Sequence, residues 1–332
     1  MQTKLLAACA FVLGAITATG ASAAGAANAA ADGPYPNRPI TFVLSASAGG
    51  ASDSVTRILA EDLSTRLGQP VVVENKPGGG GIIGTTAVAK ARPDGYTILF
   101  TFPQAVLNNR FLYSKLPYDP VRDLTFITEV SGGDMVMTVP AALPITNITE
   151  LLAYGGRHGL TFGNWGPGSY AHLIATYLGK SKKIGVTPIS YKGESPMLQD
   201  VAGGNVNVAV STLIAAQPYL QNGRLRAIAV TGGKRLPSLA SVPTLAEQGL
   251  SEPEYDMTGL LLMMAPTGTP APILERLEKE VRAAIDNPKF RARLQPLGLY
   301  AIGKGAAAAR KHYDEMYPVQ ERLVKISGAR LD

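Results

Sequence analysis

The chain has 332 residues and a formal net charge of +6, and its basic residues are scattered instead of clustered. This pattern is typical of a solvated surface, so we expect no nucleic-acid-binding face. At about 100 to 200 residues per domain, the length predicts two domains. Cys9 is the only cysteine, and His158, His172 and His312 lie far apart in the sequence. We therefore expect no metal site and no bound cofactor.

The N-terminus has the segment order of a secretory signal peptide. Lys4 supplies the positive charge, an apolar run follows over 5–16, and Ala21-Ser22-Ala23 matches an A-x-A cleavage site. We predict a signal peptide over 1–23, cleaved near Ala23, and a flexible tail over 24–34. The mature protein is then expected in the periplasm.

Lipidation of Cys9 is an alternative, because Leu6-Ala7-Ala8-Cys9 resembles a lipobox. The apolar segment before Cys9 is short, however, since such a segment spans about 7 to 15 residues. No later stretch is long and apolar enough to predict a membrane span.

After this leader, short apolar runs alternate with helical patterns. We expect strands over 40–44, 71–73 and 96–100 and helices over 55–67 and 82–91. Gly68 ends the first of these helices. Such alternation favours a largely parallel α/β sheet.

The pattern repeats in the middle of the chain, where we expect strands over 135–139, 160–162, 208–210 and 225–230 and helices over 147–154 and 170–178. Two more helices are predicted near the C-terminus. One begins at Thr269-Pro270 and ends at Asn287-Pro288, and the other covers 306–326.

No Pro/Ser-rich linker separates the two halves, which favours lobes joined by crossing strands. We place the crossings near 128–134 and 254–259. Lobe one is then expected to comprise 35–131 plus 258–332, and lobe two to comprise 132–257.

The loop over 45–53 is the strongest local signal, because it joins a strand to a helix through Gly49-Gly50 and contains no cation. The start of a helix exposes unpaired N–H groups and a partial positive charge, so it can bind a carboxylate without Arg or Lys. A plain connecting loop is the alternative. Asp53 either caps N–H groups of its own helix or orients a polar group of a ligand.

The segment 166–172 repeats this arrangement of strand end, glycine loop and helix start. Ser169 can cap its helix or bind a ligand. His172 lies in the first helical turn, where positive charge is disfavoured, so a neutral imidazole is expected.

The run 79–84 matches G-x-G-x-x-G, which keeps a nucleotide-dependent enzyme as an alternative. The dinucleotide fingerprint requires an acid at the end of the next strand, whereas this chain has Phe100-Thr101-Phe102 there. No nucleophile motif is present.

Nine segments in order resemble the Bug family, the solute receptors of tripartite tricarboxylate transporters. They are Tyr35–Ile40, Gly49–Asp53, Gly68–Gly84, Pro93–Phe100, Gly166–Leu173, Tyr191–Gly193, Arg224–Thr231, Ser241–Leu250 and Ala265–Pro270.

This resemblance implies an α/β, two-lobed type II periplasmic binding protein fold with a hinge and an interlobe cleft. It implies a monomeric receptor that captures a small carboxylate for membrane subunits of such a transporter and catalyses no reaction. A sensory receptor for a membrane kinase would share this cleft. By resemblance, backbone N–H groups, hydroxyls and water hold the ligand at Ala48, Gly49, Gly50, Asp53, Gly168, Ser169 and His172.

We expect Ser45 and four aromatic residues to complete the cleft wall: Phe102, Trp165, Tyr170 and Tyr191. The first loop is smaller and more polar here than is usual in the family, and a carboxylate is lost at Asn207. An aromatic acid or a medium-length dicarboxylate is the expected ligand.

Overall fold

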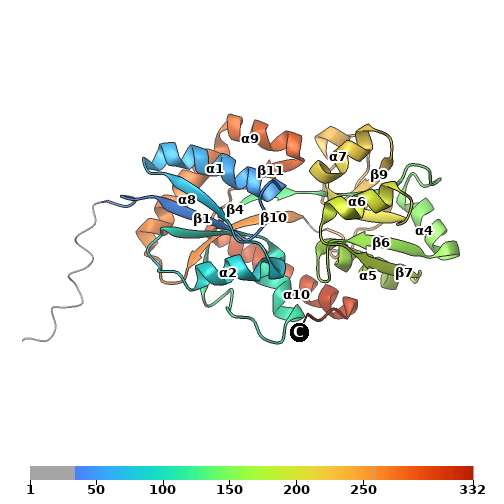
Figure 1. Cartoon of the computed structure of the whole chain (residues 1–332), viewed down its shortest axis with the longest axis horizontal. Helices are drawn as coiled ribbons and strands as arrows, with labels where there is room; N and C mark the ends of the chain where they lie inside the picture. Colours follow the sequence, from blue (N-terminus) through green and yellow to red (C-terminus); the bar gives the residue numbers. More distant parts are fainter. Residues whose placement is uncertain (1–33, 257, 332) are drawn as a thin grey trace, which may run out of the picture.

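Two α/β lobes lie side by side in a computed structural model, which describes residues 34–256 and 258–331 (Figure 1). The signal peptide predicted over 1–23 and the tail up to residue 33 lie outside the described residues. Within the described ranges, no helix is long and apolar enough to span a membrane.

Six strands form the sheet of lobe one. They are β1 (Ile40–Leu44), β2 (Val71–Asn75), β3 (Thr97–Thr101), β4 (Leu124–Gly133), β10 (Gly259–Pro266) and β11 (Leu299–Ala301). Their order in the sheet is β11-β4-β10-β3-β1-β2. β1 is parallel to β2 and β3, whereas β10 is antiparallel to β3 and β4.

Helices cover both faces of this sheet because its strands are apolar on both sides. Phe42 and Phe100 point toward α1 (Ala51–Leu67), α8 (Ala271–Asp286) and α9 (Pro288–Leu294). Val43 and Leu99, one residue away, point toward α2 (Ile82–Ala89), the π-helical turn Gln104–Asn108 and the start of α10 (Ala306–Ser327). The side chains of successive strand residues therefore pack into two separate hydrophobic cores, one on each face of the sheet.

Lobe two has a five-stranded sheet in the order β7-β6-β8-β5-β9. Its strands are β5 (Met135–Pro140), β6 (Leu160–Asn164), β7 (Val186–Ser190), β8 (Val208–Thr212) and β9 (Leu225–Val230). One face packs on α4 (Ile148–His158) and α5 (Tyr170–Lys182), and the other on α6 (Glu194–Ala202) and α7 (Leu213–Gln221).

The strands from which a parallel sheet was predicted, β1, β2 and β3, are parallel, but each sheet as a whole is mixed. β5 runs antiparallel to β8 and β9, and β11 runs antiparallel to β4. The reason is topological, because the chain enters lobe two at Asp134, between β4 and β5, and returns to lobe one at β10. β5 and β10 are reached by passing between the lobes and not through a strand–helix–strand crossover within one sheet, which is the connection that makes neighbouring strands parallel.

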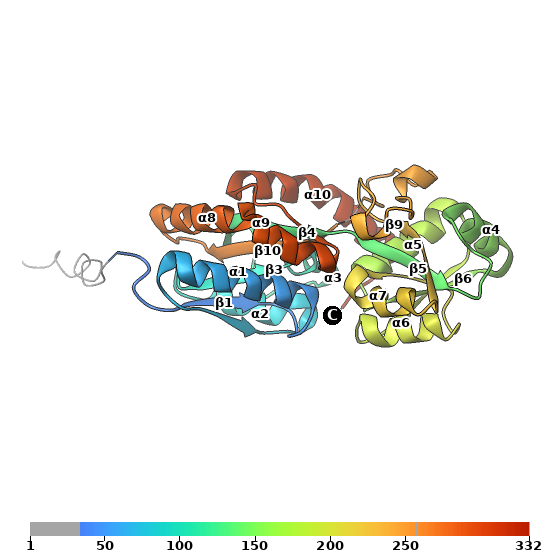
Figure 2. The same ribbon diagram turned by 90° about the horizontal axis from the view of Figure 1, so that it is seen from above.

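α10 is a further link between the lobes. Ala309 and Tyr313, in its first half, pack on the core of lobe one. Leu323 and Val324, in its second half, pack against Leu173 of α5. Pro318 lies inside the helix between these two halves. Figures 1 and 2 show α10 at the boundary between the lobes.

Candidate functional site

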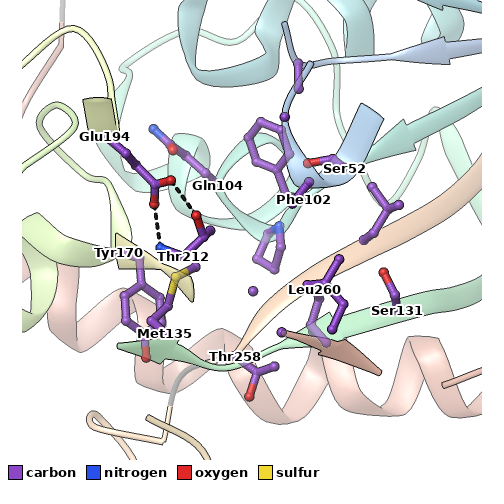
Figure 3. A pocket seen from close by; sticks show the side chains of 18 of the residues that line it. Ser52, Phe102, Gln104, Ser131, Met135, Tyr170, Glu194, Thr212, Thr258 and Leu260 are labelled. Carbon is purple, nitrogen blue, oxygen red and sulfur yellow. Dashed lines mark hydrogen bonds between the residues drawn. The ribbon is translucent and has the colours of Figure 1, made fainter. Parts of the chain in front are cut away.

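A cavity of about 1050 Å³ lies between the two lobes. Lobe one contributes residues 46–52, Val55, 102–104 and Asn108 to its lining, and lobe two contributes Trp165, Tyr170, 192–196, Thr212 and Leu213. Residues 133–135 and 258–261, where the chain crosses between the lobes, also line it. Figure 3 shows side chains from both lobes pointing into this space.

The start of α1 faces the cavity through its glycines. Gly49 has φ +84°, which favours glycine, and Gly50 begins the helix in an extended conformation without a side-chain cap. A Cβ atom built at either residue would meet no heavy atom within 4 Å. The start of α1 therefore borders open space, where its first-turn N–H groups can meet a ligand, and Ala48, Gly49 and Gly50 line the cavity as the sequence predicted.

Asp53 supports this loop from behind and does not line the cavity. Its Oδ2 accepts hydrogen bonds from the Gly49 N–H (2.9 Å) and Arg57 Nε (3.0 Å), and its Oδ1 accepts one from Asn75 Nδ2 (2.9 Å). Burial opposes ionisation of Asp53, but these three donors outweigh it and lower its pKa. Of the two roles left open, the geometry favours the structural one.

Ser45 is also placed behind the loop. It is buried, and its hydroxyl is 2.7 Å from Thr101 Oγ1 on β3. Because this hydrogen bond lies inside the sheet of lobe one, the position of Ser45 does not support a ligand contact.

The segment 166–172 of lobe two differs from the expectation. Gly168, Ser169 and His172 are absent from the cavity lining. Ser169 is fully buried, and its Oγ accepts the His172 N–H (3.3 Å) as the N-cap of α5. Nδ1 of His172 accepts the Gly168 N–H (3.3 Å), and burial lowers the pKa of His172. Because these polar groups form hydrogen bonds with one another, their role is to cap the start of α5.

The cavity is instead bordered in lobe two by the start of α6. Gly193 precedes this helix with φ +147° and without a side-chain cap. Residues 192–196 all line the cavity. The sequence carried a signal for this position in Tyr191-Lys192-Gly193, but the prediction selected the tyrosine and missed the helix start that follows it.

Three of the four predicted aromatic residues lie in the cavity wall. Phe102 comes from lobe one, and Trp165 and Tyr170 come from lobe two. Tyr191 is turned away, because its hydroxyl donates to Asp200 Oδ2 (2.7 Å) and its ring packs beside α6. Figure 3 shows Phe102 and Tyr170 on different sides of the space.

Gln104, Asn108 and Thr212 are lining residues that the sequence did not single out. Gln104 and Asn108 belong to the π-helical turn after β3, and Thr212 ends β8. All three lie at or just after the carboxyl end of a strand, which is where open α/β sheets place ligands. That rule is the only sequence signal that could have found them.

An acidic group lies where the chain crosses between the lobes. Asp134 is buried, and its Oδ1 accepts the Thr258 hydroxyl at 3.2 Å. Burial raises the pKa of Asp134 to about 6, and the nearby Asp256 adds to this rise. Hydrogen bonds from Thr258 and Tyr300 act in the opposite direction.

The lobes touch each other beside the cavity. Asn108 Nδ2 donates to the carbonyl oxygen of Gly168 across 3.4 Å. A Cβ at Gly168 would overlap Leu112 of lobe one, and a Cβ at Gly298 would come within 2.8 Å of Leu213 in lobe two. Two glycines therefore permit the close approach of the lobes.

Comparison with known proteins gives a consistent set of similarities. The family model described as "Tripartite tricarboxylate transporter family receptor" matches residues 55–327. Protein BugT of Bordetella pertussis is 34% identical over 289 residues, which is 86% of each chain.

Two solved structures have the same arrangement of lobes. A protein of R. palustris with adipate superposes with a TM-score of 0.81 at 31% identity, covering 90% of this chain and all of that one. MatC from Rhodopseudomonas palustris, with bound malate, gives 0.76 at 28% identity, covering 87% of this chain and all of that one.

Proposed function

The chain belongs to the receptor family of tripartite tricarboxylate transporters, and on that premise we propose that it captures a small organic carboxylate between its lobes. In this proposal the protein catalyses no reaction and delivers the acid to the membrane subunits of such a transporter. It acts as an exported monomer in the periplasm, after removal of residues 1–23.

The observation that carries this proposal is the uncapped start of α1 in the wall of an interlobe cavity. The amide groups at Gly50 and in the first helical turn present N–H donors and the positive end of the helix dipole, whereas the Gly49 N–H is held by Asp53. No Lys or Arg lies in the loop 45–53, so a carboxylate would be held by backbone groups. Similar proteins with bound adipate and malate support a carboxylate as the ligand class.

We propose that lobe one comprises 35–131 plus 258–332, that lobe two comprises 132–257, and that they close as two bodies. The acid binds first to α1, and closure then adds Trp165, Tyr170 and the start of α6 and removes water. A ligand drives this closure only if it binds the closed form more tightly than the open form.

The cavity volume bears on ligand size. At about 1050 Å³ it lies at the upper end of the usual range of about 300 to 1000 Å³ for small-molecule sites. A ligand of malate size would leave room for ordered water, and a longer or aromatic acid would fill more of the space.

The test is a thermal-unfolding screen with mono-, di- and tricarboxylates, aromatic acids, amino acids and nucleotides. An acid at one hundred times its Kd should add about 2.7 kcal/mol of stability. Stabilisation by nucleotides and by no acid would contradict the proposal and favour the nucleotide-dependent alternative.

Gly50→Val localises the binding. Gly50 has φ −84°, so valine fits the backbone, and its side chain would enter open space at the cavity wall. We expect the variant to fold normally and to bind the best acid at least tenfold more weakly. Gly233→Val is the matched control, because Gly233 also has open space around it and lies outside the lining.

A further inference from the structure

Glu194 places a carboxylate in the wall of the cavity. It lies in the first turn of α6 and lines the space beside Thr212. Its Oε1 accepts the Thr212 N–H (2.8 Å), and its Oε2 accepts the Thr212 hydroxyl (2.6 Å). Figure 3 shows both hydrogen bonds on the side of the cavity formed by lobe two.

No cationic side chain of the described residues forms an ion pair with this carboxylate. Among the ion pairs of residues 34–256 and 258–331, none includes Glu194. Burial raises the pKa of Glu194 in spite of the Thr212 hydrogen bonds, and no neighbouring charge contributes to the shift. A carboxylate can accept about four hydrogen bonds, and Thr212 supplies two. A partly desolvated charge without a counterion is costly, so a partner from the cavity would stabilise it.

Asn108 supplies a second unused acceptor in the same cavity. The residue is 4% exposed, and its Oδ1 has no hydrogen-bond partner among the described residues. The orientation of this amide is fixed, because the atom facing the carbonyl oxygen of Gly168 must be the Nδ2 donor. Asn108 therefore offers a buried acceptor to whatever occupies the cavity.

The charged residues of the lining are mostly acidic. Acidic residues of the lining are Asp134, Glu194, Asp256 and Glu315, and its basic residues are Lys192 and His312. A ligand with only carboxylates would meet donors at α1 but would leave the acceptors of Glu194 and Asn108 unmatched. A ligand with a carboxylate at one end and a donor at the other would match both.

We infer that the ligand carries an amino group in addition to its carboxylate, and that Glu194 binds this amino group while the start of α1 binds the carboxylate. The inference rests on the proposed function and names a ligand class for the same cavity. Glu194 is then the residue that selects amino acids over the corresponding acids without nitrogen.

Matched pairs of ligands test it by titration calorimetry. The pairs are glutamate with glutarate, 2-aminoadipate with adipate, and phenylalanine with 3-phenylpropionate. We expect the amino member of the best-binding pair to bind at least tenfold more tightly. Equal or tighter binding of the acid without nitrogen in every pair overturns the inference and leaves the carboxylate receptor intact. Binding of neither member in any pair, nor of any other carboxylate, overturns the proposed function as well.

Glu194→Gln assigns the preference to this side chain. It keeps the size of the residue and one acceptor for Thr212, but it removes the charge. We expect the amino preference to fall at least tenfold, with affinity for the acid without nitrogen changed less than threefold. An equal loss for both members would make Glu194 only a support for α7 and would overturn the inference.

Glu150→Gln is the matched control for stability. Glu150 accepts hydrogen bonds from both the N–H (2.7 Å) and the hydroxyl (2.9 Å) of Thr146, the same contact that Glu194 makes with Thr212, but outside the cavity lining. Both variants lose a comparable helix-start contact, and only Glu194→Gln should change ligand preference.

Discussion

The carboxylate of Asp53 accepts a hydrogen bond from the N–H of Gly49 across 2.9 Å, so an acid in the first turn of α1 holds the loop in front of its own helix. Arg57 and Asn75 donate to the same carboxylate. The loop that presents the open N–H groups is thereby fixed before any ligand arrives.

Replacing Asp53 with alanine should therefore lower stability. The Gly49 N–H and the Asn75 amide lose a charged acceptor, at a cost of about 1–3 kcal/mol in the free energy of unfolding measured with urea. Arg57→Ala is the control, because the Arg57 side chain is half exposed and such a pair contributes about 0–1 kcal/mol. Equal losses in both variants would show that the ion pair, and not the loop contact, matters.

The same carboxylate predicts a dependence on pH. The pKa of Asp53 is lowered in the folded protein from its ordinary 3.8, so its contribution is complete above that value and is lost as pH falls below it. The difference in stability between wild type and Asp53→Ala should thus be constant near pH 7 and shrink in strong acid. A gap that widens there would contradict the assignment.

Ser169→Ala should affect folding more than binding. Ser169 is fully buried and caps α5, and loss of such a cap costs about 1 kcal/mol. Ligand affinity should stay within threefold of wild type. Asn147→Ala removes the corresponding cap of α4 and gives the reference loss. A larger effect on affinity in Ser169→Ala would return Ser169 to the ligand site.

Gly168→Ala should hinder closure of the lobes. Its Cβ would overlap Leu112 across the boundary, so we expect at least tenfold weaker binding and a larger radius of gyration with saturating ligand, measured by X-ray scattering. Gly223→Ala is a close control, because both glycines have φ +71° and Gly223 has nothing within 4 Å of its Cβ. Similar losses of affinity in both variants would point to backbone strain alone.

Asp134→Asn should stabilise the protein above pH 6. The raised pKa of Asp134, about 6, means that the folded state holds a proton that the unfolded state releases near 3.8. Wild type therefore loses stability as pH rises between these two values, by about 1–3 kcal/mol in all. The variant lacks this loss, so the two melting temperatures should diverge from pH 4 to pH 7. Asp256→Asn, at an exposed position, should change little.

Much of the fold follows from local patterns, and the reasons for the exceptions are physical. Strands such as β1 and β3 are apolar runs bounded by turn residues, and α8 has one apolar face and an entry at Pro270. α6 and α7 escaped prediction because each spans nine residues and α7 contains Pro218. Their stability comes from packing on the sheet, which sequence periodicity does not reveal.

Of the polar groups in the candidate site, only those at the start of α1 were predicted, and lobe two was represented by Trp165 and Tyr170. The loop at Gly49-Gly50 could be found from the sequence, because its two glycines directly precede a helix and no Lys or Arg lies in 45–53. The remaining polar residues are Glu194 and Thr212 of lobe two and Gln104 of lobe one, which carry no motif and come together only because the topology places three strand ends around the cavity. The repeated glycine pattern at 166–168 attracted attention because it looks like the first loop, yet its polar groups are satisfied internally.

Pro318 is the position at which α10 bends most easily. Proline removes one hydrogen bond from the helix and clashes with the preceding turn, so a helix bends most easily there. This weak point falls where α10 leaves lobe one and reaches lobe two. A straight, rigid α10 that packs on both lobes would resist their opening. A helix that bends at Pro318 can follow this motion and keep its contacts with both lobes.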